Sequence, residues 1–256
     1  MTTMHSGPMP SGRMNRTEHI AIGEPLHWLS LGLQDFRRAP SVGIAYGLMV
    51  AFMGWLIFAL GDHPYFIAAA VSGFLLVGPI LGAALIESSR VLERGGKPTF
   101  DSSLRALDRN RAALQRFALA LLTIAVAWLA LSTSLLIATV GPLAPKVAMA
   151  LWDSALRYMS SDQLFAWAAI GGMLAVLCFS ISVIAVPLIL DKQVSAGEAM
   201  RASLRAVSRH PMASAAWALL IVVLAAIGFA TALVGLIVIY PVLGHASWHA
   251  YRALRK

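Results

Sequence analysis

The chain has 256 residues, of which 59% are hydrophobic and only 12% are charged, and its mean hydropathy is +0.74. A soluble domain carries about 25% charged residues, so this composition excludes a water-soluble globule and predicts a protein that lipid surrounds. The net charge of +8 is spread between apolar stretches rather than gathered in a basic domain, which argues against nucleic acid as a partner.

The N-terminal segment differs from the rest of the chain. Residues 1–21 are expected to form a disordered cytoplasmic tail, because their apolar residues are too scattered for the core of a signal peptide. From Pro25 to Arg38 apolar residues recur on one helical face, which predicts a helix on the membrane surface. Pro40 is expected to separate this helix from the first membrane crossing.

Five stretches lack Asp, Glu, Lys and Arg and are long enough to cross a hydrocarbon core, which needs about 20 residues. The last, 212–251, is about twice that length, so we expect two crossings with a turn between Gly228 and Gly235. The chain is therefore predicted to be an all-α, polytopic transmembrane helical bundle over residues 22–256. Its six predicted crossings are 41–60, 65–86, 117–140, 164–190, 213–230 and 233–250.

The basic residues predict the orientation of these crossings. With the N-terminus inside, the cytoplasmic segments 1–40, 87–116, 191–211 and 252–256 hold 18 of the 20 Lys and Arg residues. This distribution agrees with the tendency of positive charge to stay on the cytoplasmic side. We therefore expect both termini in the cytoplasm.

A seven-residue pattern occurs twice, at an offset of 100 residues. Ser103–Arg109 and Ser203–Arg209 share Ser, Leu, Arg, Ala and the final Arg, and each copy follows an inward crossing and precedes an outward one. Because both copies run in the same direction, we expect two similar units related by an axis along the membrane normal. The alternative is a chance similarity between two short segments rich in Arg, Ala and Leu.

Both copies are expected to be amphipathic helices at the lipid interface. Ser195 and Glu198 have the spacing of a capping box at the start of the second copy. Anionic lipid headgroups are the expected partners of the basic faces, and the alternative is that this charge only fixes the topology. The interface residues are Arg105 and Arg109 in the first copy and Arg201, Arg205 and Arg209 in the second.

Small residues at four-residue spacing predict close helix packing. Gly43 and Gly47 lie in the first predicted crossing, and Gly78 and Gly82 lie in the second. Such pairs allow helix backbones to approach closely within lipid, so we expect a tight hairpin between these two crossings. Pro79 is expected to kink the second of them.

Four side chains are candidate metal ligands. His245 and His249 share one face of a helix, at a spacing that can hold a metal ion. Glu87 and His210 are expected at the same membrane depth, with Glu87 as the acid nearest to His245. The alternative is that His245 bonds to a neighbouring helix and that His249 belongs to the aromatic belt at the interface.

Motifs of known enzymes are missing from the sequence. It has no phosphate-binding Gly-rich loop, no HExxH pattern and no GxSxG pattern, and its one cysteine, Cys178, excludes both a disulfide within the chain and a cysteine metal site. The predicted crossings carry no acid or base near their middle, where transporters usually place one. We therefore expect no enzyme activity and no cofactor.

Short motifs along the chain carry a family resemblance. They include Trp28-Leu29, Asp35-Phe36, Tyr46-Gly47, Ser72-Gly73-Phe74, Gly78-Pro79, Glu93-Arg94-Gly95 and the C-terminal segment Pro241–Arg252. Over residues 22–256 the chain resembles a proteobacterial integral membrane family, domain of unknown function 2189. The resemblance implies a protein of the inner membrane of Gram-negative bacteria whose biochemical role is not defined.

Some members of that family are labelled as cytochrome c oxidase subunit I. Haem and copper centres require several intramembrane histidines, whereas only His245 and His249 are candidates in this chain. We therefore do not expect an oxidase. The leading hypothesis is a non-catalytic scaffold or accessory subunit, which could assemble with a membrane protein partner or with further copies of itself. The second is a small transporter of a neutral or apolar substrate, and the third is a metal- or haem-binding redox accessory protein.

Overall fold

The computed structural model describes residues 20–59, 82–140 and 160–255, and all regular secondary structure in these ranges is helical. The predicted all-α fold is therefore confirmed. Residues 82–93 form a helix that precedes α4. The other helices are α1 (Glu24–Arg38), α2 (Pro40–Ala59), α4 (Phe100–Asp108), α5 (Arg111–Val140), α8 (Ser161–Ser182), α9 (Ala185–Lys192), α10 (Ala196–Arg209), α11 (Pro211–Ala230) and α12 (Leu236–Leu254).

Four segments of the described chain are long and apolar enough to cross a membrane. They lie in α2, in α5, over Ser161–Lys192 and in α11, and they coincide with four of the six predicted crossings. The predicted crossing 65–86 lies mostly outside the described residues, as do the predicted N-terminal tail and the kink at Pro79. The sixth predicted crossing forms α12, which is not one of these four segments.

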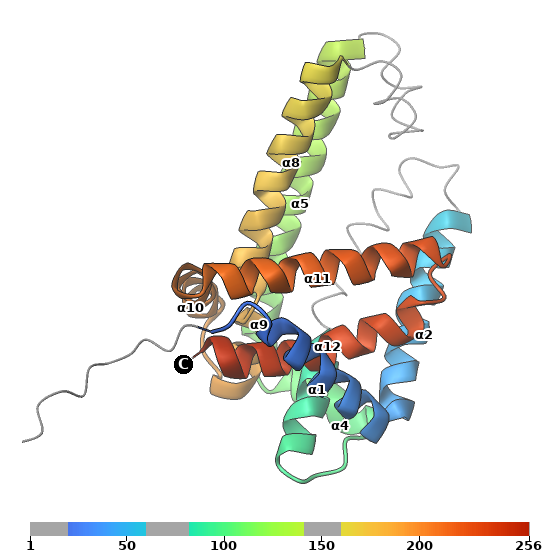
Figure 1. Cartoon of the computed structure of the whole chain (residues 1–256), viewed down its shortest axis with the longest axis vertical. Coiled ribbons are helices and arrows are strands. Elements are labelled where there is room, and N and C mark those ends of the chain that lie inside the picture. Colours follow the sequence, from blue (N-terminus) through green and yellow to red (C-terminus); the bar gives the residue numbers. More distant parts are fainter. Residues whose placement is uncertain (1–19, 60–81, 141–159, 256) are drawn as a thin grey trace, which may run out of the picture.

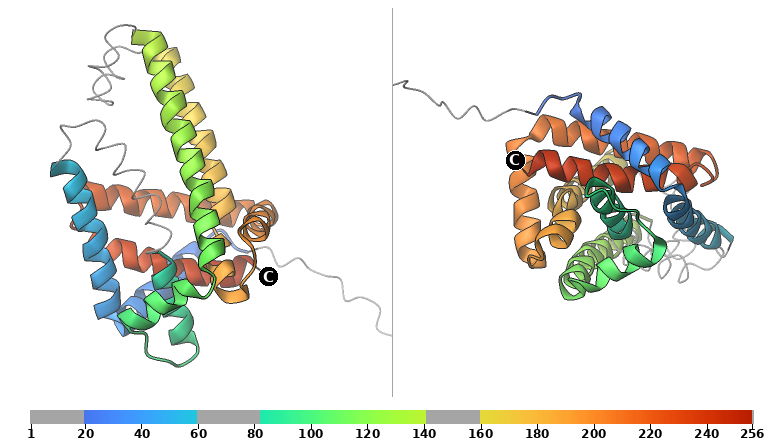
Figure 2. Two further views of the ribbon diagram at one scale, coloured as in Figure 1. Left: turned by 180° about the vertical axis from the view of Figure 1, so that it is seen from behind. Right: turned by 90° about the horizontal axis from the view of Figure 1, so that it is seen from below.

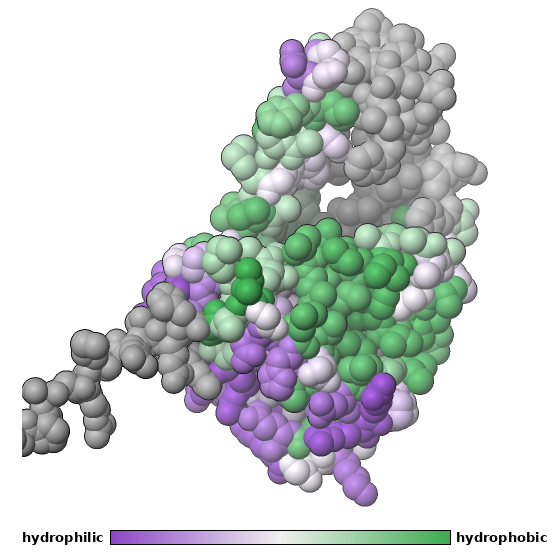
Figure 3. Space-filling view, viewed as in Figure 1, coloured by the Kyte–Doolittle hydropathy of each residue, from purple (hydrophilic) through white to green (hydrophobic). Residues whose placement is uncertain are grey.

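Helices α5 and α8 run side by side as a long hairpin that projects from the other helices (Figure 1). The rings of Trp128 and Trp167 pack between them, with centroids 5.5 Å apart. Helices α11 and α12 run across the direction of this hairpin, as both the front and back views show (Figure 2). Hydrophobic residues cover the face over α11 and α2, and hydrophilic residues gather beside and below it (Figure 3).

Helix α12 lies at the centre of the packing. Among the labelled helices, α12 has its most extensive contacts with α1 and α2, and no other pair of labelled helices is in contact as extensively. A side chain at Gly32 of α1 would lie 2.6 Å from the backbone nitrogen of Ala246, and one at Gly47 of α2 would overlap the carbonyl group of Ile237. A side chain at Gly32 or Gly47 would therefore force these helix backbones apart. Gly47 thus faces α12, and a side chain at Gly43 would meet Phe36 of α1 and Pro241 of α12. The predicted hairpin between the first two crossings stays a prediction, because the second crossing lies mostly outside the described residues.

The predicted break between Gly228 and Gly235 is present, because α11 ends at Ala230 and α12 begins at Leu236. Ala232 and Leu233 adopt positive φ angles of 50° and 70°, which non-glycine residues rarely do. Helix α2 holds this turn in place. Leu233 is buried against Gly54, and the indole nitrogen of Trp55 donates a hydrogen bond of 2.7 Å to the carbonyl oxygen of Ala232.

The predicted crossing 164–190 is divided into α8 and α9 by a break at residues 183–184. Pro187 explains the break, because it has no amide hydrogen to donate to Val183 and its ring crowds that carbonyl group. At the same break, the amide of Ile184 donates a hydrogen bond of 3.3 Å to the hydroxyl of Ser203. A residue of the second repeat copy thus stabilises the break.

The two copies of the repeated pattern have similar surroundings in the described helices, whereas the superposition of the two complete units stays a prediction, because the crossing before the first copy lies mostly outside the described residues. Each copy is a helix that turns a corner into a candidate membrane span, α4 into α5 and α10 into α11. Ser103 and Ser203 are both buried, as are Ala106 and Ala206, and the equivalent arginines of both copies are exposed. The same register places the buried rings of Phe117 and Trp217 at corresponding positions in the two spans. The direction of the axis relative to the membrane stays a prediction.

Candidate functional site: the carboxylate collar of α12

Three carboxylates from three different helices surround the C-terminal half of α12, and we call them the carboxylate collar. Asp35 comes from α1, Glu93 from the helix over 82–93, and Asp191 from α9. Each accepts a hydrogen bond from a different residue of α12. The polar and aromatic residues of the last turns of α12 therefore hold three separate helices.

The first contact of the collar is between α1 and α12. Asp35 is only 5% exposed, and its Oδ2 atom lies 2.8 Å from Nε2 of His249. Burial raises the pKa of Asp35, but hydrogen bonds from His249 and Ser89 and the charges of the two nearby histidines outweigh burial. The pKa of Asp35 therefore lies below its ordinary value, and the carboxylate stays ionised.

The second contact joins the helix over 82–93 to α12. The indole nitrogen of Trp248 donates a hydrogen bond of 2.7 Å to Glu93, and a guanidinium nitrogen of Arg252 lies 3.0 Å from the other oxygen of the same carboxylate. The guanidinium group of Arg252 also lies 5.9 Å from the centroid of the Trp248 ring. Charge and hydrogen bonding thus act on the Glu93 carboxylate, and cation–π attraction joins its two partners, Arg252 and Trp248, to each other.

The third contact joins α9 to the end of α12. The hydroxyl of Tyr251 and Nη1 of Arg255 each donate a hydrogen bond of 2.8 Å to Oδ2 of Asp191. The same Arg255 nitrogen donates to the Tyr251 oxygen at 2.6 Å, so the three groups form a closed triangle. Tyr251 is fully buried, which makes this a stabilising contact rather than a surface ion pair.

His245 is fully buried one turn before the collar. Its Nδ1 atom lies 2.8 Å from the hydroxyl of Ser89, and its Nε2 atom has no hydrogen-bond partner among the described residues. A serine next to a histidine can act as a nucleophile only where a substrate can reach the serine. Ser89 is 1% exposed, so this pair is closed off from solvent in the structure and links α12 to the helix over 82–93.

Glu87 lies in a separate buried cluster. Its carboxylate accepts hydrogen bonds of 2.6 and 2.8 Å from Arg90, and Nη2 of Arg109 lies 2.5 Å from it. Burial raises the pKa of Glu87, but the hydrogen bonds and charges of the two arginines outweigh burial and hold this pKa below its ordinary value. Two guanidinium groups thus compensate one buried carboxylate.

The predicted metal-ligand set is not assembled. Asp35, and not Glu87, is the acid that bonds to His249 and acts electrostatically on His245, so the prediction for Glu87 is wrong. His210 lies at the corner between α10 and α11. Among the residues that the structure describes, no three His, Cys, Asp or Glu side chains gather closely enough to hold a metal ion. The alternative prediction, that His245 bonds to a neighbouring helix, is confirmed by its contact with Ser89.

The five predicted interface arginines are all exposed. In α4, however, Arg105 forms an ion pair with Asp101, and the residue that follows the helix, Arg109, bonds to buried Glu87. Arg201, Arg205 and Arg209 of α10 are absent from the ion pairs of the described chain. The arginines of the two copies therefore differ in their partners, and the contact between Arg109 and Glu87 is one that the sequence alone does not reveal.

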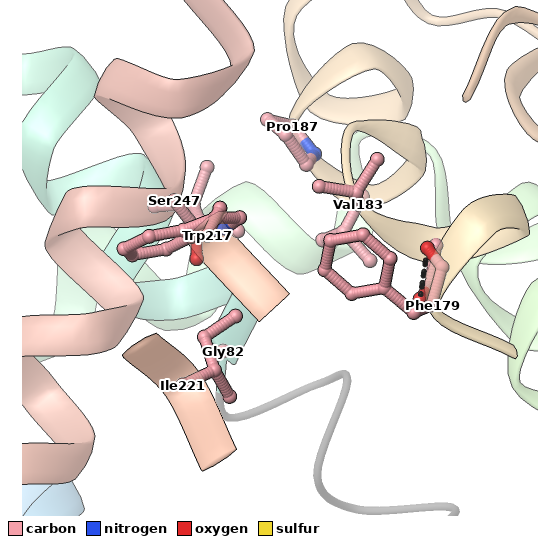
Figure 4. A pocket seen from close by; sticks show the side chains of 10 residues that line it. Gly82, Phe179, Val183, Pro187, Trp217, Ile221 and Ser247 are labelled. Atoms are coloured by element: carbon pink, nitrogen blue, oxygen red, sulfur yellow. Dashed lines mark hydrogen bonds between the residues drawn. The ribbon is translucent and has the colours of Figure 1, made fainter. Parts of the chain in front are cut away.

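A small apolar cavity of about 200 Å³ lies between the helix over 82–93, the α8–α9 segment, α11 and α12 (Figure 4). Phe179, Val183 and Pro187 face Trp217 and Ile221 across it. Its two described polar side chains are already bonded to their own helices, since Ser182 donates to the carbonyl of Cys178 and Ser247 to that of Leu243. The cavity therefore suits an apolar group and offers no charge.

Sequence reasoning missed Asp35, Glu93 and Asp191 as a set. One feature of the sequence could have indicated these acids. The C-terminal segment is otherwise apolar but contains four side chains that can donate hydrogen bonds, those of His245, His249, Arg252 and Arg255. Polar side chains in such a segment must find partners when buried, which predicts acids on neighbouring helices. The pattern does not say which of the chain's 12 acidic residues supply them.

Comparison with known proteins agrees with this architecture. A family model described as "Predicted integral membrane protein (DUF2189)" matches residues 66–191, a range that includes Glu87, Glu93 and Asp191. No curated protein and no solved structure matches the chain. The proteobacterial origin and the oxidase label of some family members stay predictions. The resemblance itself is confirmed: over residues 66–191 this chain carries the sequence pattern of the DUF2189 family of predicted integral membrane proteins.

Proposed function

We propose that this chain is a non-catalytic scaffold or accessory subunit of the bacterial inner membrane, with both termini in the cytoplasm. The observation that carries the proposal is the carboxylate collar: Asp35, Glu93 and Asp191 are each engaged with α12. The acids that could have bound a substrate instead fix α1, the helix over 82–93 and α9 to one central helix. A rigid platform is what an accessory subunit needs.

The outer faces of the candidate spans support this proposal. Phe52 of α2 is 64% exposed and Val222 of α11 is 63% exposed, among many other large apolar side chains. Lipid accounts for such exposure on a membrane helix, and so does a second membrane protein. The location and orientation rest on the basic residues, of which 18 of 20 lie in the predicted cytoplasmic segments.

Purification of the tagged full-length chain from its native membranes, directly into lipid nanodiscs, tests the scaffold role. We expect one membrane protein, or further copies of this chain, to co-purify in stoichiometric amount. A multi-pass protein of the same membrane, tagged and purified in the same way, is the control for non-specific association. A monomeric chain that transports solutes would contradict the proposal.

A small transporter of a neutral or apolar substrate is the second candidate, and the apolar cavity favours it. Val183 lines this cavity and is buried. Val183→Trp would fill the cavity, so a transporter should lose flux into proteoliposomes while a scaffold should keep its partner. The matched control is Val222→Trp, which places the same side chain on the exposed face of α11.

A further inference from the structure

The two helices of the internal repeat differ in charge at equivalent positions. Residues 100–109 contain two acids, Asp101 and Asp108, and two arginines. Residues 200–209 contain three arginines and no acid, because Arg201 and Ser208 occupy the positions of the two aspartates. The first copy is therefore neutral and the second carries a charge of +3.

The first copy uses both of its arginines within the protein. Arg105 pairs with Asp101 one turn earlier on α4. Arg109 lies 2.5 Å from the buried carboxylate of Glu87 and completes the clamp that Arg90 begins. Neither guanidinium group of this copy is available for a ligand without the loss of an existing ion pair.

The second copy leaves two of its arginines without such partners. Arg205 and Arg209 are exposed, and neither forms a hydrogen bond or an ion pair with a residue that the structure describes. Glu198, the acid of α10, is engaged at the start of the helix, where its carboxylate bonds to the amide and hydroxyl of Ser195. Two adjacent turns of α10 therefore present uncompensated positive charge.

The position of α10 indicates where this charge acts. The helix ends at Arg209, and the candidate membrane span of α11 begins at Pro211, so α10 lies at the membrane boundary. Leu204 is 39% exposed and Met212 is 63% exposed, which supplies apolar contacts next to the arginines. Figure 3 shows hydrophilic surface at α10 beside the hydrophobic surface of α11. Exposed Arg and Leu together on one helix are typical of a surface that binds lipid headgroups.

We propose that α10 is a binding site for anionic phospholipid, with Arg205 and Arg209 as the groups that bind the headgroup phosphate, and that α4 is not such a site despite its matching sequence. The proposal does not depend on the scaffold role, since it requires only that the chain lies in a membrane.

Native mass spectrometry of the full-length chain, titrated in detergent with phosphatidylglycerol or phosphatidylcholine, tests the proposal. We expect the double variant R205Q/R209Q to bind phosphatidylglycerol about thirtyfold more weakly, given the usual contribution of each surface charge. Arg105→Gln is the matched control at the equivalent repeat position and should change binding less than about twofold. The double variant R205K/R209K retains the charge and should stay within about threefold of the unmodified chain.

Three results would overturn the proposal. They are equal weakening by Arg105→Gln, equal binding of phosphatidylglycerol and phosphatidylcholine, and displacement of the lipid by millimolar inorganic phosphate, which would indicate a phosphate site. If R205Q/R209Q does not elute as a folded protein in size-exclusion chromatography, the single variants Arg205→Gln and Arg209→Gln replace it. Each should then weaken phosphatidylglycerol binding about fivefold, and no change in either would also overturn the proposal.

Discussion

At the scale of single residues, the charged side chains that contribute most to stability are the ones that are buried away from water. Glu87 is 4% exposed and Arg90 is 6% exposed, and the two form a buried ion pair to which Arg109 adds a second positive charge. Asp101 and Arg105 form the same kind of pair, but their side chains are 70% and 75% exposed. Water screens an exposed ion pair, so its loss changes the free energy of unfolding little. The loss of one member of a buried ion pair leaves an uncompensated charge and destabilises the protein strongly.

Glu87→Gln should therefore destabilise the protein strongly. The substitution removes the direct ion-pair partner of the buried guanidinium group of Arg90, which costs about 3–5 kcal/mol. Arg105→Gln removes only the exposed pair and should cost less than about 1 kcal/mol. Unfolding of both variants in mixed detergent micelles, followed by tryptophan fluorescence, measures the difference. Equal stability of the two variants would show that the Glu87 cluster is not buried in the membrane-inserted protein.

The same clusters predict how stability depends on pH. The pKa values of Asp35 and Glu87 are lowered in the folded protein, so the unfolded chain binds more protons as the pH falls. The two carboxylates contribute fully to the free energy of unfolding above the ordinary carboxyl pKa values. This contribution is lost as the pH falls through their lowered pKa values in the folded protein. Thermal unfolding should show a stability loss from these groups that begins below about pH 4.5. Glu87→Gln should make that loss shallower, and an unchanged acid profile would contradict the prediction.

At the scale of helices, α12 organises the fold because small residues allow other helices to approach its backbone. Gly32 of α1 faces Ala246, and Gly47 of α2 faces Ile237. The turn before α12 is held from α2, through Leu233 against Gly54 and Trp55 against Ala232. These contacts, together with the collar, bring four elements onto one helix.

Gly47→Ala should separate α2 from α12. The added methyl group would overlap the carbonyl of Ile237, and since a backbone group cannot turn aside as a side chain does, the cost should be about 1–3 kcal/mol. Gly172→Ala is the matched control, because a methyl group at Gly172 of α8 meets nothing within 4 Å. That change should be neutral or stabilise the helix by up to about 1 kcal/mol. Detergent unfolding midpoints compare the two, and a harmless Gly47→Ala would mean that α2 and α12 are not in close contact.

At the scale of the whole molecule, the distribution of charge predicts the topology. A reporter fused after residue 256 should be active on the cytoplasmic side, and one inserted within residues 143–162 should be active in the periplasm. The reason is that the segments predicted to be cytoplasmic hold nearly all basic residues. Paired reporters, one active only in each compartment, measure both positions. A periplasmic C-terminus would remove the crossing that is predicted over 233–250.

The sequence by itself determined the class of this protein. Its apolar composition, the length of its charge-free stretches and the positions of its prolines and glycines predict membrane helices and their ends. Helix α1 begins beside Pro25 and α2 begins at Pro40, as the sequence indicates. These features depend on neighbours along the chain, since a helix begins and ends through local backbone chemistry. The repeated pattern could also be found without a structure, because it is a short run of consecutive residues.

Only the tertiary structure decided which residues meet. Asp35 and His249 are 214 residues apart in the chain, and Glu93 and Trp248 are 155 apart, yet each pair is bonded. Periodicity places a side chain on a face of its own helix but does not say which helix packs against that face. This is why Glu87 was expected beside His245 and instead bonds to Arg90 and Arg109. It is also why the sequence does not show that Arg109 bonds to the buried Glu87, whereas the equivalent Arg209 is exposed without an ion pair in the described chain.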